Sequence, residues 1–227
     1  MDGGSLQRTD DLVQPRFRAA CVDCPAARTG CFRSCVSDGA STCRFVKATV
    51  LARGTLPAAW AARYAFALVR RGVLVRTRAA AHGADVAIDC AGTGALVPWA
   101  SDATQLGFAA TEAMVCLFPR EGLLEQLARD PDTARDILDG LGAALTRVER
   151  YAEARGQRSA EARVATTLAV LADTLSPPAR RTRLPASFQQ RDLASLAAVR
   201  HESVCRVLGK LEREGRVERS TDGLRVG

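Results

Sequence analysis

Apolar residues near the C-terminus recur at spacings that predict a short helix, a turn and a longer helix. Leu193 and Leu196 suit the short helix, in which Ala194 is small enough for a second helix to cross closely. The longer helix is expected to start near Arg200 or His201. Its apolar stripe recurs at helical spacing and consists of Val204, Val207, Leu208 and Leu211.

A glycine and a hairpin pattern follow the second helix. Gly215 can supply the left-handed residue that ends the helix. The segments VER and LRV then flank STDG, in which Asp222 and Gly223 predict a tight turn. Helix, turn, helix and β-hairpin in this order are typical of a winged helix-turn-helix, which is a DNA-binding module. We expect this domain to occupy residues 156–227.

The exposed face of the longer helix carries the chemistry. Glu202 and Arg206 lie four residues apart and therefore project from one face. Arginine can bridge the O6 and N7 acceptors of guanine, and a carboxylate can accept from the cytosine amino group. Outside such a module the two would more often form a surface ion pair. Within it we interpret them as base-reading residues, with phosphates passing near Arg200, His201 and Lys210.

The overall composition says less about the partner of this protein than the positions of these residues do. The net charge of +7 and a pI near 9.3 suit a polyanionic partner, although an Arg- and Ala-rich chain is also typical of a GC-rich genome. The start MDGGSLQRTDDL does not resemble a signal peptide, and the apolar run PAAWAARYAFALV is too short to cross a bilayer. We therefore expect a cytoplasmic protein without membrane contact, in which eight cysteines are poor candidates for disulfides.

A long helix is predicted over residues 130–155. Asp130 can cap its start, and Pro131 suits the first helical position. Apolar residues then alternate at spacings of three and four, as in a heptad seam: Leu138, Leu141, Leu145, Val148 and Ala152. Charged residues flank the seam, namely Arg147, Glu149, Arg150 and Glu153. We expect the seam to join two copies of the chain. The alternative is that it faces the chain's own core.

Residues 44–129 have a different character. The apolar, β-branched segments FVKATVL, LVRRGVLVRT, ADVAIDC and AMVCLF alternate with turns containing Gly or Pro. They predict a compact antiparallel β-roll, although AAWAARYAFAL has a helical pattern. Beyond the long helix, Ser159 can cap another helix that runs to about Leu175. The expected fold class is thus α+β, with a β-roll, a long helix and a winged helix-turn-helix.

From about Arg44 onward the chain resembles the CRP/FNR family of bacterial transcription regulators. DLASLAAVRHESVCRVLGKLEREG resembles the family's DNA-binding motif, and VLARGTLP and LVRRGVLV resemble its cyclic-nucleotide-binding-like β-roll. The resemblance implies a sensor roll, a dimerisation helix, a palindromic double-stranded DNA operator and RNA polymerase as a further partner. It assigns base recognition to Glu202 and Arg206, with Ser203 nearby. Two residues depart from the pattern: Ala198 stands where the turn usually has Gly, and Cys205 replaces a recognition Ser.

The resemblance also bears on the signal. Cyclic-nucleotide binders of this family use a Glu and an Arg in a short segment of the roll. The corresponding segment here, GALVPWASDATQLGFAAT, contains no Arg, Lys or Glu. A buried cyclic phosphate would lack its charged partner, so we exclude cyclic AMP as the effector.

Five of the eight cysteines lie in residues 1–43, a cysteine-rich N-terminal segment. FNR-type oxygen sensors hold a 4Fe–4S cluster with three N-terminal cysteines and one distant cysteine. The resemblance assigns these ligand roles to Cys21, Cys24, Cys31 and Cys116. The spacing differs from the familiar pattern, because the gap before Cys31 is one residue longer. Cys35 or Cys43 could therefore replace one of the ligands.

Several alternatives remain open at this stage. A zinc site of Cys21, Cys24, Cys31 and Cys35, thiol-based sensing without metal, and haem bound at His82 are each chemically reasonable. Cys116 could also be a structural thiol, and we interpret Cys90 and Cys205 as non-ligands. Cys21-Val-Asp-Cys24 could belong to a dithiol oxidoreductase, but no strand precedes it as that fold requires. We expect a regulator, not an enzyme. Target genes, operator sequence and the direction of regulation do not follow from the sequence.

Overall fold

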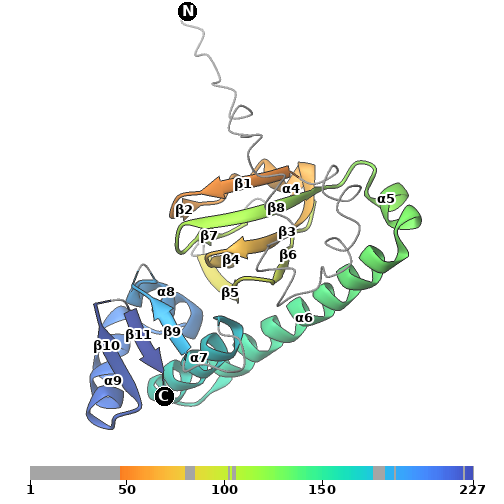
Figure 1. The fold of residues 1–227 in the computed structure, drawn as a ribbon. Helices are drawn as coiled ribbons and strands as arrows, with labels where there is room; N and C mark the ends of the chain where they lie inside the picture. Colours follow the sequence, from red (N-terminus) through yellow and green to blue (C-terminus); the bar gives the residue numbers. More distant parts are fainter. Residues whose placement is uncertain are drawn as a thin grey trace, which may run out of the picture.

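The computed structural model describes residues 47–79, 85–101, 103, 106–175, 182–186, 188–221 and 223–226. Within these ranges a β-roll leads into one long helix, which runs past the roll to a smaller C-terminal domain of helices and a sheet (Figure 1). This arrangement confirms the predicted α+β fold class.

The described strands of the roll form two antiparallel sheets. One has the order β1-β8-β3-β6 and the other β2-β7-β4-β5. Side chains from both sheets, including Val69, Val115, Leu74 and Ala109, form one buried cluster between them. The strands are β1 (Lys47–Leu51), β2 (Gly54–Thr55), β3 (Tyr64–Arg71), β4 (Leu74–Ala79), β5 (Asp85–Ala91), β6 (Leu96–Pro98), β7 (Phe108–Ala109) and β8 (Ala113–Pro119).

The helical pattern of AAWAARYAFAL was a misleading signal. Only α4 (Trp60–Arg63) is helical, and the chain then continues as strand β3. β3 lies between β8 and β6 and is covered on both faces, with Ala67 in one apolar cluster and Phe66 in another. A strand buried on both faces loses the alternation of polar and apolar residues that would identify it.

Two helices follow the roll, α5 (Leu123–Arg129) and α6 (Pro131–Gly156). The Asp130 carboxylate accepts the backbone N–H of Thr133 at 2.9 Å, which confirms the predicted cap. The side of α6 buried against its own chain includes Ile137, Ala144 and Tyr151. The predicted seam lies on a different side, because Leu138, Leu141 and Leu145 remain 67%, 36% and 60% exposed.

Two of the charges that flank the seam belong to intrachain ion pairs. Arg147 donates from Nε to Oδ1 of the fully buried Asp89 on β5 at 3.0 Å, and Arg150 pairs with Asp173. Arg147 also donates to the carbonyl of Leu96. These contacts attach α6 to the roll and to the next helix. The two arginines are thus engaged within one chain, unlike the free flanking charges of a simple coiled coil.

The C-terminal domain contains three helices and three strands among its described residues. The helices are α7 (Ala160–Leu175), α8 (Gln190–Ala197) and α9 (His201–Arg213), and the strands are β9 (Thr182–Pro185), β10 (Val217–Ser220) and β11 (Gly223–Val226). The Ser159 hydroxyl accepts the N–H of Ala162 at 3.0 Å and so caps α7 as predicted. β9 was not predicted. It pairs with β11 and adds a third strand to the wing.

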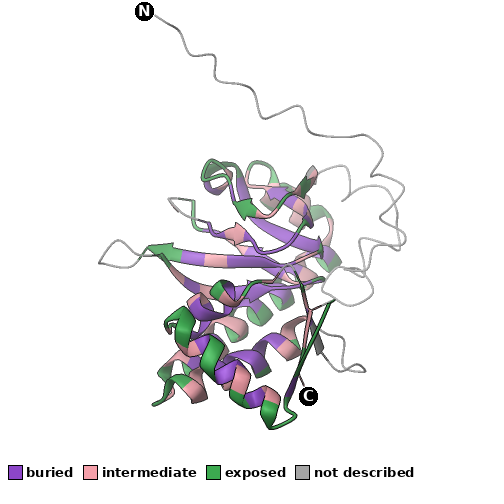
Figure 2. Cartoon of the chain, turned by 90° about the vertical axis from the view of Figure 1, so that its left-hand side faces the viewer, coloured by how far each residue is buried: buried purple, intermediate pink, exposed green. Residues whose placement is uncertain are grey.

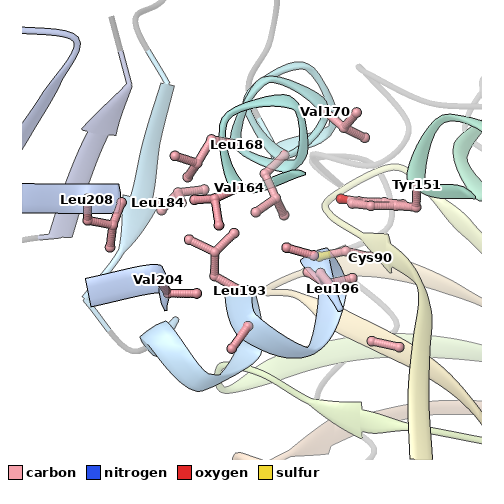
Figure 3. Packing of buried hydrophobic residues seen from close by; sticks show 14 of the residues in the cluster. Cys90, Tyr151, Val164, Leu168, Val170, Leu184, Leu193, Leu196, Val204 and Leu208 are labelled. Carbon is pink, nitrogen blue, oxygen red and sulfur yellow. The ribbon is translucent and has the colours of Figure 1, made fainter. Parts of the chain in front are cut away.

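The core of this domain is continuous with part of the roll. Leu168, Leu193, Leu196 and Val204 point toward one another from α7, α8 and α9, and Cys90 of β5 joins them (Figure 3). Figure 2 shows the same arrangement as a band of buried residues running from the strands into the inner faces of the helices, whose outer faces are exposed. The apolar core therefore spans both domains.

Two local features were predicted after α9, a glycine that ends the helix and a hairpin turn, and only the first lies where it was expected. Gly215 adopts φ 71°, and Arg216 donates its N–H to the carbonyl of Leu211 at 2.9 Å, which is the predicted glycine ending of a helix. The hairpin turn is shifted from the prediction. Ser220 pairs with Gly223, so Gly223 belongs to β11, and Thr221 lies in the turn.

The turn between α8 and α9 contains Ala198 at φ 51° and ψ 49°, the left-handed region expected from its departure from Gly. Among the described non-glycine residues, only Ala198 has a positive φ. Val199 follows it and donates its N–H to the carbonyl of Ala194 at 3.1 Å. The turn is therefore closed at the cost of a strained alanine.

We predict that Ala198→Gly stabilises the protein. Relief of the left-handed strain outweighs the greater freedom of glycine in the unfolded chain, for a net gain of about 0.5–1 kcal/mol in the free energy of unfolding. Urea denaturation measures the change. Ala169→Gly is the matched control, because Ala169 is exposed in the interior of α7 and its replacement should cost about 1 kcal/mol. A loss of stability in Ala198→Gly would contradict the interpretation.

Candidate nucleic-acid interface

Helix α9 has one strongly buried face. Val204, Val207, Leu208 and Leu211 are all buried, and they contact α7 and α8. The longer helix and its stripe thus match the sequence prediction. Because these side chains fix the rotation of α9 about its axis, the residues on the opposite side must face outward.

Most of the predicted DNA-contacting residues lie at the exposed start of this helix. Arg200 is the residue before α9, and Ser203 is half-buried. The exposed residues are Arg200, His201, Glu202, Cys205 and Arg206. The structure brings these six side chains together within two turns of one helix.

Glu202 and Arg206 do not form the ion pair that their spacing allows. Among the described residues, neither side chain takes part in an ion pair or hydrogen bond. Nearby, Cys205 donates from Sγ to Oε1 of Gln190 at 3.0 Å, and its sulfur lies 3.8 Å from Nδ1 of His201. The carboxylate and the guanidinium are therefore available to an external partner.

Lys210 lies near the C-terminal end of α9 and pairs with acidic residues of the same chain. Its Nζ lies 2.6 Å from Oε1 of Glu161 on α7 and 3.9 Å from Glu214. The hydrogen bond to Glu161 raises the pKa of Lys210. Lys210 therefore has partners within the chain, although its side chain remains exposed.

The arginines of α8, α9 and the wing fall into two groups, according to whether they form an ion pair within the described part of the chain. On the wing, Arg216, Arg219 and Arg225 each pair with a glutamate of the same domain. On α8, on α9 and between them, four arginines form no ion pair within the described part of the chain: Arg191, Arg200, Arg206 and Arg213. Sequence reasoning missed Arg191 and Arg213. Arg213 could have been found, because it lies seven residues after Arg206 and thus on the same face.

Of the four predicted metal ligands, only Cys116 lies within the described residues. Cys21, Cys24, Cys31 and the substitute Cys35 lie outside the described residues, as does His82. Cys116 lies on β8, opposite Ala48 of β1 and Leu68 of β3. It is half-buried and packs against the apolar cluster that contains Ile137 of α6. Among the described residues there is no group of three or more metal-ligating side chains.

Cys90, in contrast, is enclosed. It is fully buried on β5, and burial strongly raises the pKa of its thiol. A protonated thiol without solvent access is a poor metal ligand and a poor nucleophile. This agrees with its interpretation as a non-ligand. Its contribution is to the core, where it lies beside Tyr151 of α6 (Figure 3).

A search of the described residues for membrane-spanning helices found none with the required length and hydropathy.

Comparisons with known proteins agree with this geometry. Residues 162–226 match the model of the Crp-like helix-turn-helix domain. A probable transcriptional activator of Rhizobium leguminosarum bv. viciae is 26% identical over 119 residues, which cover 52% of this chain and 50% of that protein. The chain thus matches about half the length of this curated relative.

Solved structures share the fold at low sequence identity. FixK2 of Bradyrhizobium japonicum has a TM-score of 0.64 at 19% identity, with 80% of this chain and 91% of that chain covered. A CooA variant of Carboxydothermus hydrogenoformans has a TM-score of 0.66 at 16% identity, with 87% and 91% covered. The matched domain is a helix-turn-helix, and the curated relative is described as a transcriptional activator. Residues 162–226 are thus similar to the Crp-like helix-turn-helix domain, and the described fold of the chain resembles that of these solved structures.

Proposed function

We propose that the protein acts as a homodimer that reads a palindromic operator with the start of α9. The observation that carries this proposal is the pair Glu202 and Arg206, exposed, without an ion pair and opposite the buried stripe. Arg206 would donate to the O6 and N7 atoms of a guanine, and Glu202 would accept from a cytosine amino group. Arg200, His201, Ser203 and Cys205 would contact neighbouring base edges or phosphates, with Arg191 and Arg213 as further phosphate contacts.

The first prediction concerns selectivity for DNA sequence. Operators are first selected by the wild-type protein from random duplexes. Glu202→Ala together with Arg206→Ala should then lower the preference for the selected sequence over unrelated DNA by about thirtyfold or more, because each of the two base contacts contributes roughly 1–3 kcal/mol. Binding competition at fixed salt measures this ratio.

The matched control is Arg71→Ala together with Glu112→Ala. This pair carries the same functional groups, and it is exposed on the roll. The control should bind like the wild type. Undiminished selectivity in the Glu202 and Arg206 variant would refute base reading by α9.

Dimerisation through α6 is the second part of the proposal. Leu138, Leu141 and Leu145 expose a row of leucines on a helix whose other side is already buried against the roll. Val148 and Ala152 continue the row toward the C-terminal domain. A second copy of the same helix would cover these apolar side chains and would place two recognition helices about one DNA turn apart.

We predict that Leu145→Glu converts the dimer to a monomer, since a buried glutamate in the seam would lack a partner. Sedimentation equilibrium measures the mass. Ala143→Glu is the control, because Ala143 is exposed on α6 and lies away from the seam. A Leu145→Glu variant that remains dimeric would show that the two copies meet elsewhere.

The third part concerns the signal. We propose a 4Fe–4S cluster held by Cys21, Cys24, Cys31 and Cys116, with Cys35 as a substitute ligand. The observation in favour is the position of Cys116 on β8, opposite Ala48 of β1, which is the strand with which the described part of the chain begins. A bound cluster would supply sensitivity to oxygen or nitric oxide. Because Cys116 packs in the cluster of Ile137, an altered ligand there would affect the roll face that carries α6.

Other signals stay as alternatives. Zinc at the N-terminal cysteines, haem at His82 or thiol oxidation would leave the DNA-binding part unchanged. Solved relatives show that ligands vary on this fold, because one is CprK complexed with OCPA and another is described as responsive to c-di-GMP. Cyclic AMP is not part of the proposal, since the corresponding segment contains no Arg, Lys or Glu to pair with its phosphate or ribose. A dithiol oxidoreductase is a remote alternative.

We further propose a cytoplasmic location, RNA polymerase as a partner at promoters, and the domain limits 1–43, 44–129, 130–155 and 156–227.

The cluster makes a chemical prediction. Anaerobically purified protein should contain about four iron and four acid-labile sulfide atoms per chain, and air should remove them and weaken operator binding. Cys116→Ser should lose the iron, whereas Cys205→Ser should retain it. Zinc in place of iron would support the zinc alternative, and metal-free protein with air-stable binding would refute metal sensing.

A further inference from the structure

An ion pair connects the roll directly to the helix-turn-helix. Arg53 lies between β1 and β2, and its Nη2 donates to both carboxylate oxygens of Asp192, at 2.9 and 3.0 Å. Asp192 lies on α8 and is only 3% exposed. The same guanidinium donates through Nη1 to the carbonyl of Ala110 in the roll. The arginine is thus fixed to the roll at one end and to α8 at the other.

Asp192 has a second task in its own helix. Its Oδ2 accepts the backbone N–H of Gln189 at 2.8 Å, which completes a capping box at the start of α8. The carboxylate is therefore rigidly connected to the first turn of α8. A guanidinium that binds this carboxylate therefore also restricts the orientation of α8 relative to the roll.

Apolar contacts alone would leave that direction loosely defined. Val73, Val75 and Cys90 of the roll share a buried cluster with Leu193 and Leu196 of α8. Apolar burial is non-directional, so it favours contact between the domains without fixing one rotation. A guanidinium bound to both oxygens of a buried carboxylate is directional, because it tolerates little rotation of either partner.

The direction of α8 determines that of the recognition helix. α8 and α9 are joined by a short turn, closed by the hydrogen bond from Val199 to Ala194, and they pack against each other. We infer that Arg53 is a positioning residue for DNA recognition, which acts through Asp192 to set the spacing of the two recognition helices in the dimer. This inference rests on the proposed function.

The experiment measures dependence on half-site spacing with the full-length protein. The selected operator is compared with versions in which one or two base pairs are inserted between the half-sites. For the wild type the insertions should lower affinity by about tenfold or more, since the recognition helices must stay one DNA turn apart. For Arg53→Gln the same insertions should lower affinity by less than about threefold, and the affinity for the selected operator should fall.

Two further variants make the result specific. Arg71→Gln removes an arginine from an exposed ion pair of the same roll and should keep the wild-type spacing dependence. Arg53→Lys retains the charge but lacks the second nitrogen that donates to the carbonyl of Ala110, so it should relax the spacing dependence even if Arg53→Gln fails to fold. Wild-type spacing dependence in the Arg53 variants would overturn the inference. Failure of the wild-type protein itself to select a palindrome would instead refute the proposed function.

Discussion

The burial of one face of α9 is the constraint on which the arrangement of this protein depends. Val204, Leu208 and their neighbours in the stripe each contribute roughly 1.5–3 kcal/mol on burial. An exposed ion pair between Glu202 and Arg206 would contribute only about 0.2–0.5 kcal/mol. The apolar stripe therefore decides which way the helix faces, and the two polar side chains are left exposed for another partner.

Two directional contacts connect this helix to the rest of the chain. Arg53 binds Asp192 across the domain boundary, and Arg147 binds the buried Asp89 between α6 and the roll. Both are held within apolar surroundings, where loss of one partner leaves an uncompensated charge. The roll is thus attached to both α6 and the C-terminal domain, in each case by an ion pair that includes a buried aspartate.

Features fixed by local sequence were predictable, and features fixed by distant partners were not. The cap at Asp130, the strain at Ala198 and the helices α8 and α9 depend on neighbouring residues. In contrast, β9 forms only because β11 lies beside it. The pairings of Arg53 and Lys210 were also missed, since Arg53 and Asp192 are 139 positions apart and Lys210 and Glu161 are 49 apart. No local pattern reports such contacts.

Protection of guanine N7 from methylation by dimethyl sulfate tests base reading by α9 most directly. On a selected operator the wild-type protein should protect one guanine in each half-site, because the Arg206 guanidinium would cover its N7 atom in the major groove. Arg206→Ala should lose protection at that guanine alone while other contacts persist. If the protection pattern of Arg206→Ala equals that of the wild type, α9 does not read the operator in the way described.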